Sequence, residues 1–260
     1  MKYAWMLLFF AAAPLCAEDV KSTESAEQSW LKQFSISAEV DVVSKYIFRG
    51  WDVYDDRPAF QPSFTLNTPN VGLGFSVWGS WALSGREEHE ASTKTLDEID
   101  LTFFFRRRFW QLEFGVGHIS YIYPNTDGHA GTTSELFTDV RFYVPALPAF
   151  VPVSVYGQLF YDYDKGNDYY LRFGADAGPN LTVAENITLT FPLQFWVGYN
   201  HGQLNVDSAI ADVNFGAGVQ VGWRCLWAKL VVNYTITPED TINPHDDGEF
   251  WALFALGVSF

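Results

Sequence analysis

The stretch Phe34-Ser35-Ile36-Ser37-Ala38-Glu39-Val40-Asp41-Val42 decides the fold. Its even positions are apolar and its odd positions are polar. Successive side chains of a β-strand point to opposite faces, so this alternation predicts a strand with one apolar and one polar face.

The same alternation recurs along the rest of the chain in segments of about nine to fourteen residues. Strands of soluble proteins usually have roughly 5–6 residues, whereas a tilted strand that crosses a bilayer needs roughly 9–11. The segment length therefore indicates strands that span a membrane. The twelve expected segments are 34–49, 58–66, 71–83, 96–106, 109–122, 134–144, 150–163, 169–177, 186–199, 209–222, 226–236 and 249–260.

The connections between these segments alternate between compact turns and mostly longer, polar loops. The expected compact turns are 67–70, 107–108, 144–149, 178–181 and 224–225. Short periplasmic turns that alternate with longer external loops are typical of outer-membrane barrels. We therefore expect an all-β fold over 34–260, namely an antiparallel up-and-down transmembrane β-barrel of about 12 strands in the bacterial outer membrane.

In such a barrel the apolar face contacts lipid and the polar face lines the enclosed lumen. The residues that we expect in the lumen are Glu39, Asp41, Lys45, Arg49, Asp100, Glu113, Asp139, Arg141 and Arg172. Aromatic residues at the ends of the lipid face are expected to form belts at the head-group level. The expected members are Tyr46, Phe48, Trp81, Tyr161, Tyr199 and Tyr234 at the outer end, and Phe34, Phe105, Trp110 and Phe260 at the periplasmic end.

The N-terminus and the composition narrow the range of functions. Residues 1–17 combine one lysine, an apolar core and small residues, which predicts a cleaved signal peptide, and the polar stretch 18–33 predicts a flexible periplasmic tail. The formal net charge of −15 argues against nucleic acid as a partner. The sequence has no glycine-rich phosphate loop or Cys/His zinc spacing, so no cofactor or bound metal is expected.

Two stretches resemble a known family. Ser44-Lys45-Tyr46-Ile47-Phe48-Arg49-Gly50, followed by Arg57-Pro58-Ala59-Phe60-Gln61, is similar to the opening signature of the TorF-like group, a bacterial family described as porins of the outer membrane. Gly117-His118-Ile119-Ser120-Tyr121-Ile122-Tyr123-Pro124, with the later Glu135, resembles a second stretch of that family. The resemblance implies a barrel with a pore role and identifies no solute.

The expected function is passive diffusion of small solutes, with cationic or neutral ones preferred because carboxylates outnumber cations among the inward residues. A closed barrel, plugged by paired charges and serving as a structural or loop-presenting protein, is the alternative. Outer-membrane lipid and lipopolysaccharide are expected partners, as is the barrel assembly machinery through Phe260. The sequence leaves the oligomeric state open.

A lipid hydrolase is a third hypothesis. His118 and Ser120 share the outward face of one segment, and a two-residue turn at Arg107-Arg108 would place Asp97 across from His118. A serine hydroxyl needs a neighbouring base, and the base needs an orienting carboxylate. His-x-Ser on an outward strand resembles outer-membrane phospholipases and lipid A deacylases, but their following Asn-Gly is replaced here by Tyr121-Ile122. We expect no enzyme, with Ser120, His118 and Asp97 as the residues to test.

Overall fold

A computed structural model describes residues 34–84, 97–124, 132–145, 148, 150–203, 208–243 and 247–260. The expected signal peptide (1–17) and tail (18–33) lie outside these residues. Within the described part of the chain, no helix is long and apolar enough to cross a membrane.

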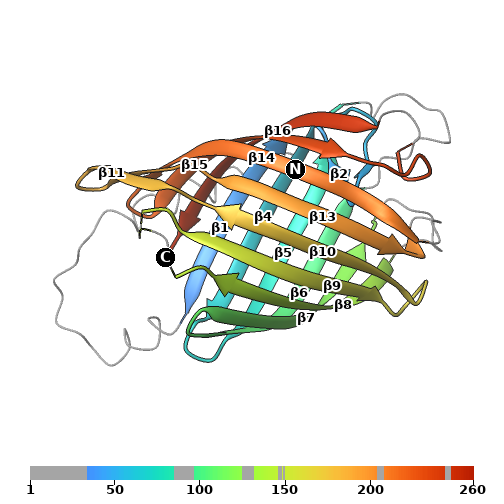
Figure 1. The fold of residues 1–260 in the computed structure, drawn as a ribbon, viewed down its shortest axis with the longest axis horizontal. Coiled ribbons are helices and arrows are strands. Elements are labelled where there is room, and N and C mark those ends of the chain that lie inside the picture. Colours follow the sequence, from blue (N-terminus) through green and yellow to red (C-terminus); the bar gives the residue numbers. More distant parts are fainter. Residues whose placement is uncertain are drawn as a thin grey trace.

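Twelve antiparallel strands close into one barrel, because the last strand of the circuit pairs with the first. Figure 1 shows the barrel on its side, with strongly tilted strands. In order around the wall the strands are β1 (Ser35–Val43), β4 (Ala59–Thr68), β5 (Leu73–Ala82), β6 (Glu98–Phe109), β7 (Leu112–Ile122), β8 (Thr132–Tyr143), β9 (Val153–Asp162), β10 (Asp168–Ala177), β13 (Leu193–His201), β14 (Ser208–Trp223), β15 (Leu226–Ile236) and β16 (Gly248–Ser259). The expected barrel and its strand number are confirmed.

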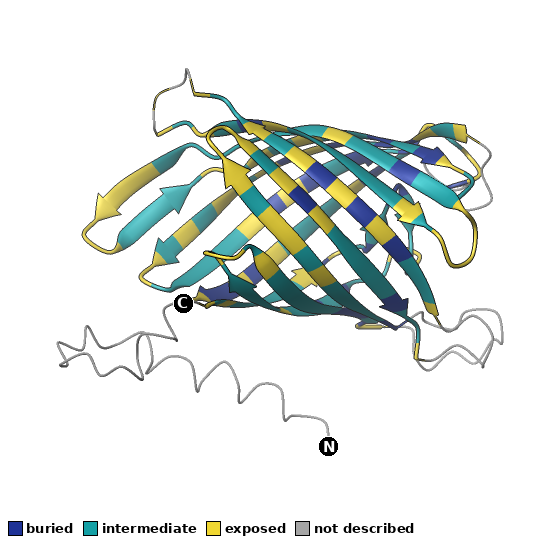
Figure 2. Ribbon diagram, turned by 90° about the horizontal axis from the view of Figure 1, so that it is seen from below, coloured by how far each residue is buried: buried dark blue, intermediate teal, exposed yellow. Residues whose placement is uncertain are grey.

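Exposed residues alternate with less exposed ones along the strands, as the colours of Figure 2 show. Phe173 and Val232 are 60% and 50% exposed, whereas Asn214 and Asn233 are buried. Water-soluble barrels bury their apolar face, so the reverse distribution is that of a wall surrounded by lipid.

Two of the expected compact turns are in the wrong place. The turn between β6 and β7 lies at Trp110-Gln111 rather than at Arg107-Arg108. Arg107 instead remains in β6, and its guanidinium reaches the carbonyl oxygen of Asn70. A charged side chain is tolerated there because it extends to the polar rim of the barrel.

The second wrong turn is 178–181. The chain continues as β11 (Asn180–Ala184), turns at 185–186 and returns as β12 (Ile187–Thr190). β12 pairs with residues 220–223 at the end of β14. Outside the ladders between strands, the backbone N–H of Asn180 donates to the carbonyl oxygen of Phe150. The β11–β12 hairpin therefore extends the wall at the end of the barrel that carries the C-terminus (Figure 1).

The expected segment 58–66 forms as β4 despite a proline in a central strand. Pro62 lies opposite Val40 of β1, but the ladder to β5 is interrupted between Phe60 and Ser63. Proline has no N–H to donate. At this interruption the side chain of Gln61 donates to the hydroxyl of Ser80, 3.1 Å away, and supplies a hydrogen bond between the same two strands.

The expected segment 34–49 is wrong in its second half. β1 leaves the wall after Val43, and β2 (Ile47–Phe48) pairs only with β3 (Trp51–Asp52) in a separate two-stranded sheet. Tyr46 and Phe48, expected in the outer aromatic belt, therefore do not lie in the wall strand. Residues 44–57 are called the inward hairpin below, because their contacts lie on the enclosed side of the wall.

Candidate functional site

The turn of the inward hairpin is built by Arg49 and Gly50. Ile47 pairs with Asp52 and Phe48 with Trp51, which leaves these two residues as the turn, with φ of 51° and 86°. Two-residue hairpins with positive φ at both turn positions favour glycine. A Cβ at Gly50 would also lie 2.5 Å from the carbonyl oxygen of Ala211, so only glycine fits this close approach to β14.

Arg49 fixes the tip of the hairpin to the opposite wall. Its Nη1 and Nη2 donate to the two carboxylate oxygens of Glu135 on β8, at 2.8 and 2.7 Å. Its Cζ lies 5.0 Å from the ring centroid of Phe160 and 4.7 Å from that of Tyr170. Burial disfavours the charge of Arg49, but Glu135 favours it, and the pKa of the guanidinium lies above its ordinary value. Such a bidentate pair is both strong and directional.

The entering arm of the hairpin is held by Tyr46. Its hydroxyl donates to Glu98 Oε2 at 2.9 Å, and its ring packs against Trp78 and Tyr54. Tyr54, on the returning arm, donates to the hydroxyl of Ser80 at 3.1 Å. Both tyrosines belong to a buried cluster, so the hairpin has an apolar core in common with β1, β4 and β5.

Further contacts bind the hairpin to the remaining wall. Phe48 packs against Tyr121 of β7, and Thr237, just after β15, donates its hydroxyl to the carbonyl oxygen of Gly50 at 2.9 Å. The hairpin thus contacts residues on β5, β6, β7, β8, β9, β10, β14 and β16. A segment that reaches almost every strand from one mouth of the barrel narrows the lumen there.

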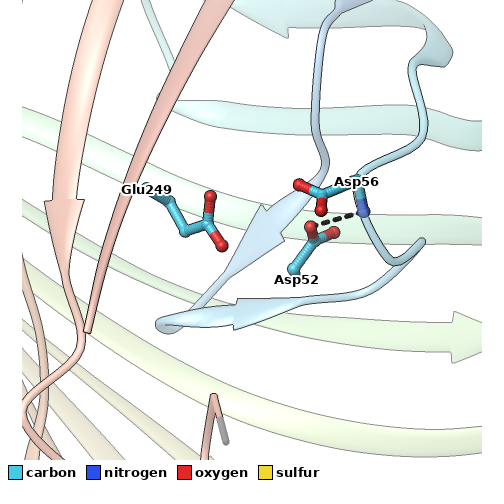
Figure 3. A group of neighbouring side chains, drawn as sticks. All are labelled: Asp52, Asp56 and Glu249. Atoms are coloured by element: carbon cyan, nitrogen blue, oxygen red, sulfur yellow. Dashed lines mark hydrogen bonds between the residues drawn. The ribbon is translucent and has the colours of Figure 1, made fainter. Parts of the chain in front are cut away.

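Three carboxylates gather where the hairpin meets β16. Single oxygen atoms of Asp52, Asp56 and Glu249 lie within 4.8 Å of one another, and Figure 3 shows Asp52 and Asp56 on the hairpin facing Glu249. The ammonium group of Lys45 forms ion pairs with Asp56 and Glu249. Lys45 therefore supplies positive charge to this cluster, which makes it an ion-pair network of the chain itself.

Several of the other residues expected in the lumen are paired with side chains of neighbouring strands. Asp139 accepts from Arg106 at 3.0 Å, and Arg141 donates to Asp176 at 2.6 Å. Glu113 lies 3.7 Å from Arg106, Glu39 accepts from Lys229 at 3.1 Å, and the Cζ of Arg172 lies 5.0 Å from the ring centroid of Trp196.

Asp41 and Asp100 differ from these paired residues. Each has one buried carboxylate oxygen, Oδ1, without a hydrogen-bond partner among the described residues. Asp100 faces Trp78 across the β5–β6 ladder, and Asp41 faces Gln61 across β1–β4. These two oxygen atoms are almost wholly covered by the surrounding wall.

Sequence reasoning missed two inward arginines and the hairpin itself. Arg108 was missed because a turn was expected at Arg107-Arg108. Arg106 lay inside the expected segment 96–106 and shares its face with Asp100, so the period of two in that segment was the signal that could have placed it. Arg108 lies with its Cζ 3.8 Å from the ring centroid of Tyr143. For the hairpin, the one local signal is Arg49-Gly50, since glycine in the second position is typical of a two-residue turn.

The residues of the hydrolase hypothesis do not come together as expected. The β6–β7 register places Phe103 opposite His118 and Leu101 opposite Ser120, so the expectation that Asp97 lies across from His118 is wrong. Asp97 is buried and precedes β6. His118 Nε2 is instead 2.7 Å from the hydroxyl of Tyr163, which follows β9. The reason is the position of the turn, which shifts the partner of every β7 residue.

A family model covers most of this architecture. Residues 27–241, which include the inward hairpin and Glu135, match the model described as bacterial protein of unknown function (Gcw_chp). The chain belongs to the Gcw_chp family. The TorF-like group remains a resemblance of two stretches, and none of the curated proteins is similar in sequence to this Gcw_chp protein.

Solved structures support the fold of this Gcw_chp protein. LpxR from Salmonella typhimurium superposes with a TM-score of 0.54 at 10% identity, covering 85% of this chain and 99% of that one. The beta domain of the Bordetella autotransporter Brka gives 0.52 at 10% identity, covering 88% and 99%. An outer membrane channel from Pseudomonas putida F1 gives 0.48 at 11% identity, covering 93% and 98%. The Gcw_chp protein is thus a bacterial outer-membrane β-barrel.

Proposed function

We propose that this barrel passes small solutes across the outer membrane, with a preference for cationic or neutral ones, through a lumen that the inward hairpin narrows at its outer mouth. Twelve strands lie between the roughly 8 of barrels that side chains can fill and the roughly 16 of open porins. The enclosed wall carries charged and aromatic residues rather than a continuous apolar core, which supports a hydrated passage.

The observation that carries the cation preference is an excess of carboxyl groups over cations on the enclosed wall, where Glu98 and Asp212 accept hydrogen bonds from Tyr46 and Tyr170 rather than from a cation. The arginines of β6, β8 and β10 lie against carboxylates or ring faces, so their charge is largely balanced within the wall. Rings of carboxylates attract cations into a confined pore. Glu98 and Asp100 lie on the same face of β6, and none of the ion pairs among the described residues includes either of them.

Planar-bilayer recordings test this proposal. The purified protein is expected to form small channels whose reversal potential in a KCl gradient shows cation preference, and Asp100→Asn is expected to reduce that preference. Asp164→Asn, in the exposed turn after β9, is the matched control and should leave the reversal potential unchanged. Anion preference in the wild type would contradict the proposal.

A closed structural barrel is the second candidate, and the inward hairpin favours it because its contacts reach almost every strand. The two functions are separated by a variant in which residues 46–55 are replaced by three glycines. A solute channel is expected to show larger conductance in this variant. A variant that folds, as judged by heat-modifiable migration in gels, but forms no channels would leave the structural role standing and defeat the channel.

A further inference from the structure

We propose that glycines on the enclosed face of the wall set the width of the lumen below the inward hairpin, because they allow aromatic side chains to lie flat against the wall. These glycines are positioning residues, and through the rings they determine which solutes are small enough to pass. This role rests on the proposed channel function and applies to the periplasmic half of the lumen.

Four aromatic residues of the enclosed face lie directly opposite a glycine of the neighbouring strand. The pairs are Phe104 with Gly74, Phe137 with Gly117, Tyr156 with Gly174 and Trp227 with Gly257. A Cβ built on each of these glycines would lie between 2.1 and 2.5 Å from an atom of its paired ring. Each ring therefore lies across the backbone of the neighbouring strand, where any other residue would place its Cβ. Glycine inside a strand is typical of such a close approach.

A cation lies over three of these rings. The pairs, with the distance from the cation to the ring centroid, are Arg106 with Phe104 (5.4 Å), Arg141 with Tyr156 (4.6 Å) and Lys229 with Trp227 (5.1 Å). Each cation also forms an ion pair with a carboxylate of another strand. These carboxylates are Asp139 for Arg106, Asp176 for Arg141 and Glu39 for Lys229. Attraction between cation and ring, with the cation itself held by a carboxylate, stabilises the flat orientation of the ring.

The rings near the outer mouth are arranged differently. Trp78 lies opposite Asp100, and its ring centroid is 5.6 Å from that of Tyr46 in the inward hairpin. Trp251 packs against the same buried cluster, so these two rings fill space between the wall and the hairpin. Trp227, the second of the eleven residues of β15, is near the periplasmic end and lies on the wall instead. Rings that lie flat leave the centre of the lumen clear, so the width of the passage there depends on the glycine beneath each ring.

Gly257→Ala tests this role, because the three atoms nearest to its Cβ all belong to the side chain of Trp227. The ring must then move away from the wall. We expect a lower single-channel conductance and a lower size limit for the polyethylene glycols that enter the pore. Gly222→Ala is the matched control, since Gly222 lies opposite Trp227 on β14 but the nearest atom to its Cβ is 3.8 Å away. The double variant Gly257→Ala/Trp227→Ala removes the displaced ring and should restore or exceed the conductance of the wild type.

Gly74→Ala, whose Cβ would meet side-chain atoms of Phe104 and Asn67, is a second variant that displaces a ring and should also lower the conductance. Conductance equal to that of the wild type in both single variants would overturn the proposal. A double variant that conducts as poorly as Gly257→Ala would overturn it as well, because the ring would then not be the obstacle.

Hydroxyl-radical labelling of Trp227, read by mass spectrometry on protein that migrates as a folded barrel, reports the position of the ring without a channel. Gly257→Ala is expected to increase this labelling, and Gly222→Ala should leave it unchanged. Unchanged labelling in Gly257→Ala would overturn the proposal. Increased labelling in a protein that forms no channels would support the dependence of the ring on its glycine and defeat the channel function.

Discussion

Arg49 and Glu135 join the tip of the inward hairpin to β8 across the inside of the barrel, through two charge-assisted hydrogen bonds between residues 86 positions apart. Both side chains are almost wholly buried, with relative exposures of 4% each. Removing one partner of such a pair leaves an uncompensated buried charge, whereas removing both does not. The pair therefore stabilises the position of the hairpin tip against β8.

Glu135→Gln is expected to lower the free energy of unfolding by about 3–5 kcal/mol, the usual cost of leaving a buried charge unpaired. Urea unfolding in detergent micelles measures this loss. The double variant Arg49→Met/Glu135→Gln should recover a large part of it, because no unpaired charge remains. The single variant Arg49→Met completes the comparison. If the stability loss of the double variant equals the sum of the losses of Arg49→Met and Glu135→Gln, the two residues are not coupled.

Gly50→Val is expected to displace the hairpin and increase channel conductance. The new side chain meets the carbonyl oxygen of Ala211 and requires a positive φ that a β-branched residue resists. Gly178→Ala is the matched control, because the nearest atom to its Cβ, Thr190 Cγ2, is 3.6 Å away, which is ordinary contact. Unchanged single-channel conductance in Gly50→Val would argue against a narrowing role for the hairpin.

The wall of the barrel was predictable from sequence because alternation is a direct consequence of strand geometry. The strand predicted from the alternation that begins at Phe34 is present in the structure as β1, which ends at Val43. Beyond it, Tyr46 and Phe48 continue the same period, and a period of two holds equally for a strand in the wall and for a hairpin inside it. What separates them is the set of contacts with Glu98, Glu135 and Tyr170, all of which are distant in sequence.

The site was predictable in its residue types but not in its pairings. Opposite charges on one face predict ion pairs, but the partners depend on register. Moving the turn from 107–108 to Trp110-Gln111 places Arg106 opposite Gly115, beside Asp139 of β8, and moves Asp97 away from the position opposite His118. Register is set by turn geometry together with long-range packing, and a polar dipeptide such as Arg107-Arg108 resembles a turn even when it continues a strand.

The pH dependence of the hairpin is expected to involve Asp52. Burial raises the pKa of this carboxyl above its ordinary value, and the groups around it are Lys45, Asp56 and Glu249. A raised pKa in the folded state means that the protonated form favours the docked hairpin and that this contribution is lost as pH rises through the folded pKa. The variant Asp52→Asn, which cannot ionise, should therefore show a smaller loss of stability as the pH rises above the ordinary aspartate pKa of about 3.9.

Urea unfolding across that pH range measures this difference. Asp164→Asn, in the exposed turn after β9, serves as the control and should follow the wild type. An identical pH profile in the wild type and in Asp52→Asn would show that ionisation of Asp52 does not influence docking.

A charge on the outward face should be costly at mid-wall and harmless in an external turn. Phe173, the sixth of ten residues in β10, is 60% exposed to the surroundings of the barrel. Phe173→Arg is expected to lower the free energy of unfolding in lipid vesicles by about 2–4 kcal/mol, the cost measured for arginine at the bilayer midplane. Asp164→Arg places the same side chain in the turn after β9 and should cost little. Equal and small losses for both variants would mean that Phe173 faces water, and the assignment of this face to lipid would then be wrong.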